Sequence, residues 1–317
     1  MDHLPFSPTP LEPLRYFSSR LGCNLIAKRD DLFEKAGGGS KARMLQYILA
    51  DLSPENCDVF LTAGGPCSNF NRAAALMCGE IGLRMSLVEY TDEPDEYSTA
   101  LNSFVTGLAG VEKTSCDRGH VPETIRLVED DLERRGLRYR FCYAGGKSLE
   151  GIYAYYDAVR EVYEQGARID HLFVACGTGT TLTGICAGMA KYYPKAQIHA
   201  ISAARSLEAE MPVLEEDMTA LNAHLGTAYG FDNLHFYADY LCGGYARYSE
   251  TLLDTVKECI SHEGMIVDPT YSGKAFWGMV DIMKANPSLF KDKNVLFWNT
   301  GGLFNLLSVK CENLLHR

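Results

Sequence analysis

Short runs of apolar residues alternate with longer segments of helical spacing along most of the chain. Residues 42–52 and 71–81 carry apolar side chains at the three-to-four-residue spacing of one helix face. The apolar runs predict six strands, at residues 58–62, 85–88, 139–143, 171–175, 198–201 and 294–298. This alternation predicts an α/β fold with mainly parallel sheets, whose ligands bind beyond the carboxyl ends of the strands.

Composition narrows the class of protein. The 317 residues are 46% hydrophobic, enough for a sizeable core, and their number is typical of about two domains. Thirty Lys and Arg against 41 Asp and Glu give a net charge of −11, which would repel the phosphates of a nucleic acid. No apolar run reaches the roughly 18 residues that span a bilayer. We therefore expect neither a nucleic-acid partner nor a membrane.

The eleven cysteines are odd in number, and no two are spaced as CxxC. The first 20 residues lack the apolar core of a secretory signal, so we expect a cytoplasmic protein with reduced thiols. A structural zinc site would need scattered ligands, and buried small hydrophobic side chains are the simpler interpretation. No metal is expected.

A glycine- and threonine-rich loop, residues 177–184, follows the predicted strand 171–175 and precedes a helical pattern. Such a loop presents backbone N–H groups at a helix N-terminus and suits a phosphate group. It does not fit a dinucleotide motif, because Leu182 stands where the third glycine belongs, or a nucleoside-triphosphate loop, because Ile185 follows Gly184 where lysine is required. An ordinary strand-to-helix turn remains the alternative.

A lysine follows three glycines at Gly37-Gly38-Gly39-Ser40-Lys41, at the start of the predicted helix 42–52. A cofactor that carries one phosphate and no nucleotide is pyridoxal phosphate, which also requires a lysine amine for a Schiff base. The helix dipole and desolvation would both lower the pKa of Lys41 and make it a nucleophile. A lysine that simply extends into solvent from the loop is the alternative.

Several motifs then occur in one order along nearly the whole chain, from about residue 10 to residue 307. They are Gly38-Gly39-Ser40-Lys41 with Arg43, Gly64-Gly65-Pro66-Cys67-Ser68-Asn69, residues 177–181, Asp268-Pro269-Thr270-Tyr271-Ser272-Gly273-Lys274 and Thr300-Gly301-Gly302. This set resembles the 1-aminocyclopropane-1-carboxylate deaminase and D-cysteine desulfhydrase family. The resemblance implies the tryptophan-synthase-β-like fold type II and the cofactor pyridoxal 5'-phosphate.

The resemblance also implies roles for individual residues. Lys41 would form the Schiff base and move the Cα proton of the substrate, Asn69 would bond the phenolic oxygen of the cofactor, and Ser68 would meet the substrate carboxylate. Tyr271 and Tyr245 would line the substrate site. The remaining cofactor-binding residues would be Gly177, Thr178, Gly179, Thr180 and Thr181 around the phosphate, together with Ser272 and Thr300.

Ser272 stands where the family places the partner of the pyridine nitrogen, a position at which the cyclopropane-opening deaminases have a carboxylate. A hydroxyl can leave that nitrogen neutral, which makes a weaker electron sink and favours α,β-elimination over ring opening. Ser272 could also cap a helix that begins at Gly273, and both roles can coexist.

The sequence departs from the family pattern at Ser40, Phe70 and Asn299, at Met44 and at the pair Pro66-Cys67. Most of these positions cluster around the substrate loop rather than the phosphate loop, so we expect the cofactor to be kept and the substrate to be free to differ from that of the family. Phe70 would either narrow the substrate site or pack the core. Cys67 is expected to line the pocket, since no histidine is near it in sequence to act as its base.

The sequence thus predicts a pyridoxal-phosphate-dependent lyase that acts on a small amino acid by α,β-elimination, as a D-cysteine desulfhydrase does. A β-replacement synthase with the same cofactor is the first alternative, and a binding or regulatory member without activity is the second. The family suggests a homodimer. It also suggests two doubly wound domains, with a small one (55–163) inserted in a large cofactor-binding one (1–54 and 164–317).

Overall fold

The computed structural model describes residues 6–92, 100–244 and 247–309. The strands in these ranges are β1 (Leu11–Pro13), β2 (Asn24–Arg29), β3 (Val59–Gly64), β4 (Arg84–Tyr90), β5 (Glu112–Cys116), β6 (Tyr139–Phe141), β7 (His171–Cys176), β8 (Gln197–Ser202), β9 (Leu234–Tyr237) and β10 (Asn294–Asn299). All six strands predicted from the sequence are therefore confirmed, and β1, β2, β5 and β9 are additional.

Most of the helices connect these strands. They are α1 (Arg15–Leu21), α2 (Ser40–Ile48), α3 (Asn69–Glu80), α5 (Leu101–Leu108), α6 (Val121–Arg134), α7 (Leu149–Glu164), α8 (Thr180–Tyr192), α9 (Leu207–Leu225), α10 (Glu250–Glu263), α11 (Ser272–Ala285), α12 (Pro287–Phe290) and α13 (Leu303–Leu307), with short 3-10 helices η1 (Asp30–Leu32) and η2 (Arg118–His120). The predicted helix 42–52 begins earlier, at Ser40, and ends at Ile48, because the N–H groups of Ala50 and Leu52 enter tight turns.

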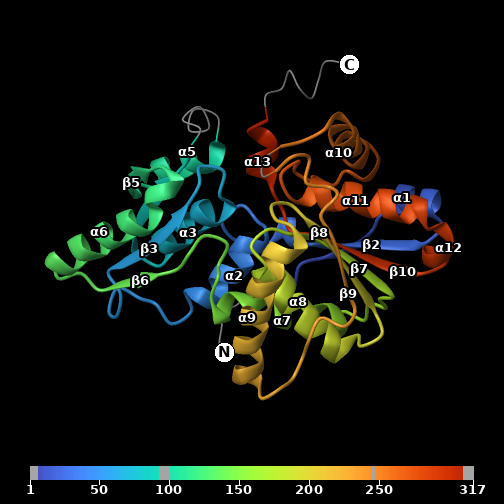
Figure 1. The fold of residues 1–317 in the computed structure, drawn as a ribbon, viewed down its shortest axis with the longest axis horizontal. Coiled ribbons are helices and arrows are strands. Elements are labelled where there is room, and N and C mark those ends of the chain that lie inside the picture. The colour runs from blue at the N-terminus through green and yellow to red at the C-terminus, as the bar shows by residue number, and fades with distance from the viewer. Residues whose placement is uncertain (1–5, 93–99, 245–246, 310–317) are drawn as a thin grey trace.

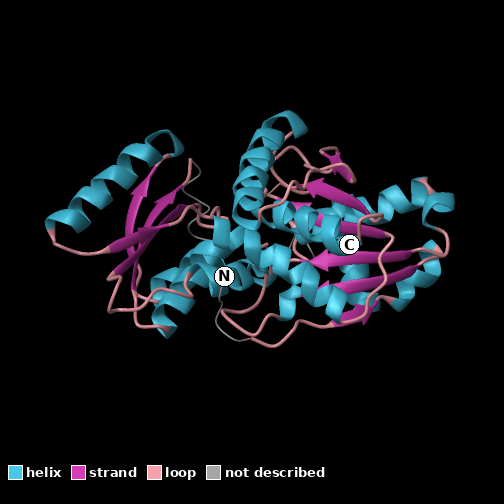
Figure 2. Cartoon of the chain, turned by 90° about the horizontal axis from the view of Figure 1, so that it is seen from below, coloured by secondary structure: helices cyan, strands magenta, loops and turns pink. Residues whose placement is uncertain are grey.

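The strands form two sheets in two lobes (Figures 1 and 2). The larger sheet has the order β1-β2-β10-β7-β8-β9 and the smaller one β5-β4-β3-β6. All neighbouring strands are parallel except β1 and β2. Every residue of β3 and of β7 is buried, as expected for central strands of parallel sheets with covered faces. The predicted α/β fold with mainly parallel sheets is confirmed.

Helix α7 packs closely against α8, and two glycines of α8 permit this. A Cβ atom at Gly184 would collide with the carbonyl oxygen of Ile152, and one at Gly188 would lie 2.6 Å from Cβ of Val159. Helix α7 also contacts α2 and α9, which belong to the larger lobe. The domain boundaries remain a proposal, and this packing favours a boundary near residue 148 over one at 163.

A buried cluster of charged groups lies beneath α2. Arg43 Nη2 is 2.7 Å from Asp30 Oδ1, and Arg43 Nη1 is 2.8 Å from Oε2 of Glu161, which also pairs with Lys28. Tyr155 Oη donates to Asp30 Oδ2 at 2.7 Å. Although burial disfavours its charged form, Arg43 and Lys28 hold the pKa of Asp30 below its usual value. The cluster ties α2 to β2, η1 and α7.

No helix within residues 6–92, 100–244 and 247–309 combines the length and apolarity that crossing a bilayer requires.

Candidate active site

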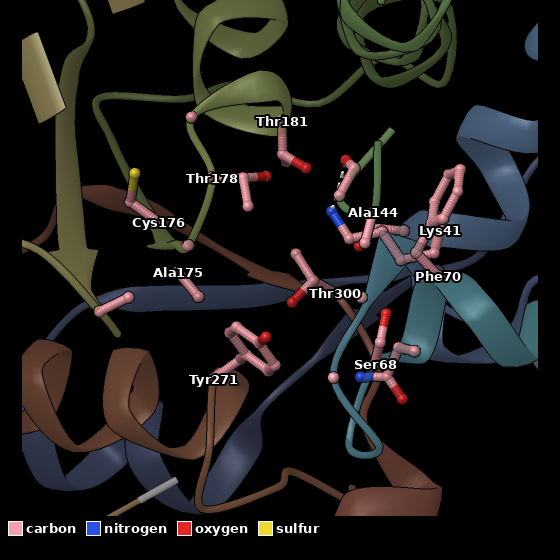
Figure 3. A pocket seen from close by; sticks show the side chains of 18 of the residues that line it. Lys41, Ser68, Phe70, Ala144, Ala175, Cys176, Thr178, Thr181, Tyr271 and Thr300 are labelled. Atoms are coloured by element: carbon pink, nitrogen blue, oxygen red, sulfur yellow. Dashed lines mark hydrogen bonds between the residues drawn. The ribbon is translucent and has the colours of Figure 1, made fainter. Parts of the chain in front are cut away.

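A cavity of about 370 Å³ lies between the two lobes, at the carboxyl ends of parallel strands of both sheets. Its walls come from the segments that follow β3, β7 and β10 and from the first residues of α2, α3 and α8. Figure 3 shows Lys41, Phe70 and Ser68 along one side, with Thr178 on the loop that leads into α8 and Thr181 in the first turn of that helix. This is the position that the parallel-sheet prediction requires.

Lys41 is the second residue of α2, and its side chain enters this cavity. The preceding Gly38 and Gly39 have φ of 79° and 97°, a region that glycine adopts without strain. Lys41 Nζ donates to the carbonyl oxygen of Gly145 at 3.1 Å. Burial lowers the pKa of the amine to about 8. A substantial share of Lys41 is therefore neutral near pH 8, as a nucleophile or a proton acceptor must be.

The loop between β7 and α8 forms a second wall. Gly177, Thr178, Gly179 and Thr181 line the cavity, and Gly179 has a φ of 83°. A Cβ atom at Gly179 would lie 2.9 Å from Oε1 of Glu210. Thr180, the first residue of α8, is buried, and its Oγ1 has no hydrogen-bond partner among the described residues. Backbone N–H groups and hydroxyls at a helix N-terminus make this loop a site for an anion.

Helix α3 presents its N-terminus to the same cavity through Ser68 and Asn69. Ser68 caps the helix, since its Oγ accepts a hydrogen bond from Asn71 N at 3.2 Å. The hydrogen of that hydroxyl and the first N–H groups of the helix are suited to a carboxylate. Phe70 is 1% exposed and serves both alternatives raised by the sequence, because it lines the cavity and packs in the main hydrophobic core.

Tyr271 faces the anion loop from the opposite side. A Cβ atom at Gly177 would lie 3.0 Å from Cε1 of its ring. Its backbone N–H donates to Asp268 Oδ2 at 3.1 Å, which fixes the turn before α11. In Figure 3, Thr300 lies between Tyr271 and Lys41, and its carbonyl oxygen accepts from Ser40 N at 2.9 Å. This hydrogen bond therefore links Thr300 directly to the start of α2.

Ser272 is fully buried behind Tyr271 and is not among the residues that line the cavity. Its Oγ lies 2.7 Å from Asp268 Oδ1 and 2.9 Å from the carbonyl oxygen of Gly301, and it accepts from Asp268 N at 2.9 Å. A ligand nitrogen would have to compete with the Asp268 carboxylate for the hydroxyl hydrogen. The predicted helix cap at Ser272 is wrong, because Ser272 is the first residue of α11 and Tyr271 occupies the cap position.

The structure thus brings together Lys41, Ser68, Asn69, Tyr271 and Thr300 around one cavity. The residues of the anion loop that share it are Gly177, Thr178, Gly179 and Thr181. Thr180, the first residue of α8, is not among the lining residues, and Tyr245 falls outside the described residues. Cys67, expected to line the cavity, is not among its lining residues.

Sequence analysis did not single out three residues at the mouth of the cavity, Tyr90, Arg118 and Arg205. Tyr90 ends β4, and Arg118 and Arg205 follow β5 and β8 by a few residues. Arg118 pairs with Asp92 at 3.1 Å, and Arg205 pairs with Glu210 at 3.2 Å. Tyr90 and Arg205 lie beyond the carboxyl ends of the predicted strands 85–88 and 198–201, a signal that could have found them, whereas Arg118 follows β5, which the sequence did not predict.

Comparisons with known proteins agree on one family. A family model described as "Pyridoxal-phosphate dependent enzyme" matches residues 4–301. D-cysteine desulfhydrase of Salmonella choleraesuis (strain SC-B67) is 29% identical over 303 residues, which are 93% of this chain and 92% of the relative. The crystal structure of a homologue of 1-aminocyclopropane-1-carboxylate deaminase is 27% identical, with a TM-score of 0.86 over 96% of this chain and 92% of that one. Threonine deaminase isoform 2 from Solanum lycopersicum, at 17% identity and a TM-score of 0.67 over 94% of this chain and 84% of that one, shares the fold.

Proposed function

Because the chain belongs to the family of pyridoxal-phosphate-dependent enzymes, we propose that it is a lyase that acts on a small amino acid by α,β-elimination. Elimination releases the Cβ substituent and leaves an unsaturated amino acid, which water would hydrolyse to a 2-oxo acid and ammonia. The D-cysteine desulfhydrases that it resembles suggest D-cysteine as the first substrate to test. The observation that carries the proposal is a lysine with a lowered pKa in the same cavity as an anion loop and a helix N-terminus.

The cavity fits pyridoxal 5'-phosphate. Thr178 and Thr181 line it together with the N-terminus of α8, which supplies the hydroxyl and backbone N–H donors that a phosphate requires. A Cβ atom at Gly177 would lie 3.0 Å from the ring of Tyr271, which also lines the cavity, so glycine there keeps the space beside the loop open. Lys41 enters the same cavity, where an aldehyde could reach its amine. When bound, the cofactor would supply that aldehyde and a ring that withdraws electrons from Cα of the substrate.

The residues around the cavity would each take a separate role in proton transfer or in binding the substrate and the cofactor. Lys41 Nζ, with a pKa of about 8, would accept the proton of substrate Cα, and the Cβ substituent would leave with the electrons of its bond. The hydroxyl of Ser68 and the N-terminus of α3 would hold the substrate carboxylate. Asn69 would bond the phenolic oxygen of the cofactor, and Tyr271 would close the side of the cavity next to Gly177.

The proposal is tested by incubating the purified protein, loaded with cofactor, with D- and L-cysteine, D- and L-serine and 1-aminocyclopropane-1-carboxylate. We expect 2-oxo acid and ammonia in equal amounts from at least one β-substituted amino acid. The Lys41→Ala variant should lose the visible absorbance of the lysine-bound cofactor and all turnover. A wild-type protein that gains no visible absorbance with added cofactor would overturn the proposal, as would stable binding of every substrate without product.

A β-replacement synthase remains the alternative, since the same residues serve it and the outcome depends on which nucleophile enters the cavity. Repeating the incubation with O-acetylserine and added thiols separates the two. A new amino acid detected by mass would favour replacement, whereas 2-oxo acid alone favours elimination. An inactive binding member is disfavoured by the geometry around Lys41.

The same proposal includes a cytoplasmic homodimer, on the basis of the family resemblance and the cysteine content. Light scattering coupled to gel filtration measures the mass directly. A mass near twice 35.1 kDa is expected, and a mass of a single chain would refute the dimer.

A further inference from the structure

Arg72 is a buried cation where the two lobes meet. It belongs to α3 of the smaller lobe, is 2% exposed, and lies over the ring of Phe304 in α13, 4.3 Å from the ring centroid. Helix α13 contacts α5 at this junction (Figure 1). Arg72 Nη2 donates to the carbonyl oxygen of Gly38 at 3.2 Å. Gly38 precedes Lys41 by three residues, so Arg72 reaches from one lobe to the loop that carries the lysine of the other.

No acidic group among the described residues pairs with Arg72, which distinguishes it from Arg43 in the charged cluster beneath α2. Burial lowers the pKa of Arg72 to about 10, so it remains charged at neutral pH. Its neutral partners do not cancel that charge, and its Nε has no hydrogen-bond partner in the described part of the chain. Burying a charge without an opposite charge destabilises a protein, so an unpaired arginine beside the cavity indicates a role in the function of the site.

The hydrogen bonds of Arg72 decide which way the Asn69 amide points. A guanidinium group only donates, so the atoms of Asn69 and Asn102 that lie 3.3 Å from Nη1 must be their Oδ1 atoms. The Nδ2 of Asn102 then shares its two hydrogens among three acceptors, Asn305 Oδ1 at 2.9 Å and the carbonyl oxygen of Cys67 and Asn69 Oδ1, both at 3.1 Å. Asn69 Oδ1 thus accepts hydrogen bonds from the protein. The Nδ2 group of Asn69 therefore remains to donate a hydrogen bond to a ligand in the cavity.

We propose that Arg72 is a positioning residue that sets two groups of the active site at once, by orienting the Asn69 amide with its N–H donors toward the cavity and by anchoring the loop before Lys41. Its positive charge also stabilises an anionic oxygen that Asn69 bonds. The proposal rests on the proposed function, because the anionic oxygen is that of the bound cofactor.

The sign of the effect on the bound cofactor follows from electrostatics. Removal of a nearby positive charge makes protonation easier, whether the group that takes up the proton is an oxygen anion or a neutral nitrogen. In both cases the pH midpoint of the change in visible absorbance rises. For one charge lost at close range we expect a rise of about 1 pH unit.

The experiment titrates the visible absorbance of the cofactor-loaded protein with pH and measures cofactor affinity. Arg72→Met should raise the midpoint by about 1 unit and weaken cofactor binding about tenfold or more, since the orientation of Asn69 is lost as well. Arg72→Lys keeps the charge, so its midpoint should stay closer to that of the wild type. Phe304→Leu is the matched control, because it removes the ring under the guanidinium and none of its hydrogen bonds.

An Arg72→Met midpoint within about 0.2 unit of wild type would overturn the proposal, and so would an equal shift in Phe304→Leu, which indicates a structural effect only. If Arg72→Met does not fold, Asn102→Ala carries the test. That variant removes the other donor to Asn69 Oδ1 and should weaken cofactor binding severalfold, whereas unchanged affinity contradicts the proposal. A wild-type protein that takes up no cofactor refutes the proposed function instead, before any variant is compared.

Discussion

Replacing Arg43 by methionine should destabilise the folded protein by about 3–5 kcal/mol, the usual cost of removing one partner of a buried ion pair. The charged cluster beneath α2 contains two acids, Asp30 and Glu161, and two bases, Arg43 and Lys28. Loss of Arg43 leaves two carboxylates facing one ammonium group. Asp30 is fully buried, so water cannot replace the lost charge. Methionine fills most of the vacated space, so the loss of charge dominates the effect.

The pH dependence of this loss has a definite sign. In the wild type the folded-state pKa of Asp30 is lowered, so its contribution to stability is present above the unfolded-state value of about 3.9 and is lost as the pH falls through the folded-state pKa. Without Arg43, burial raises the pKa of Asp30, and the folded variant takes up a proton more readily. The difference in the free energy of unfolding between wild type and variant should therefore decrease as the pH is lowered from 7 to 5.

Urea unfolding followed by tryptophan fluorescence measures this difference. The chain has two tryptophans, and the indole Nε1 of Trp298 donates to Asp30 Oδ2 at 2.8 Å, so its emission reports on the cluster itself. The control is Arg160→Met, which removes a half-exposed arginine paired with Asp157 and should cost no more than about 0.5 kcal/mol. A loss below about 1 kcal/mol in Arg43→Met, or one equal to the control, would refute the argument from burial.

Three further predictions concern the cavity. Cofactor uptake by the cofactor-free protein should accelerate with rising pH through a midpoint of about 8, because only the neutral Lys41 amine is nucleophilic. A midpoint of about 10 in stopped-flow absorbance would contradict this. Gly179→Ala should weaken cofactor binding about tenfold or more in equilibrium titrations, while Gly166→Ala, whose φ of 80° is similar but whose Cβ would meet nothing within 4 Å, should leave it unchanged. Cys67→Ala should retain turnover within about threefold, because Cys67 does not line the cavity. Loss of activity would instead support a role of Cys67 as a nucleophile, which the sequence disfavours.

The local features of the site were readable from the sequence. Glycines before Lys41 and around Thr178 indicated loops at helix N-termini, and both loops do precede helices, α2 and α8. The apolar runs at residues 171–175 and 294–298 indicated strands of a mainly parallel sheet, and they form its central strands β7 and β10. These inferences succeeded because strand periodicity, glycine conformation and helix starts are properties of neighbouring residues.

Other features depend on residues that are far apart in sequence. The sequence placed Ser272 against a ligand or at a helix cap, whereas the fold holds its hydroxyl between Asp268 and the carbonyl oxygen of Gly301. Nothing local to Arg72 indicates that it lacks an acidic partner within the part of the chain that the structure describes, since that depends on α13, α5 and the Gly38 loop meeting around it. The lowered pKa of Lys41 likewise results from burial by both lobes.

The sequence by itself thus determined the α/β class, the parallel strands and the chemical groups that a phosphate-bearing cofactor requires. Only the tertiary structure decided which of those groups share a cavity and which way their donors point. The physical reason is that hydrogen-bond direction and desolvation are set by the partners that surround a group. Asn69, Arg72 and Lys41 have such partners in Asn102, Gly38 and Gly145, which lie on distant segments of the chain.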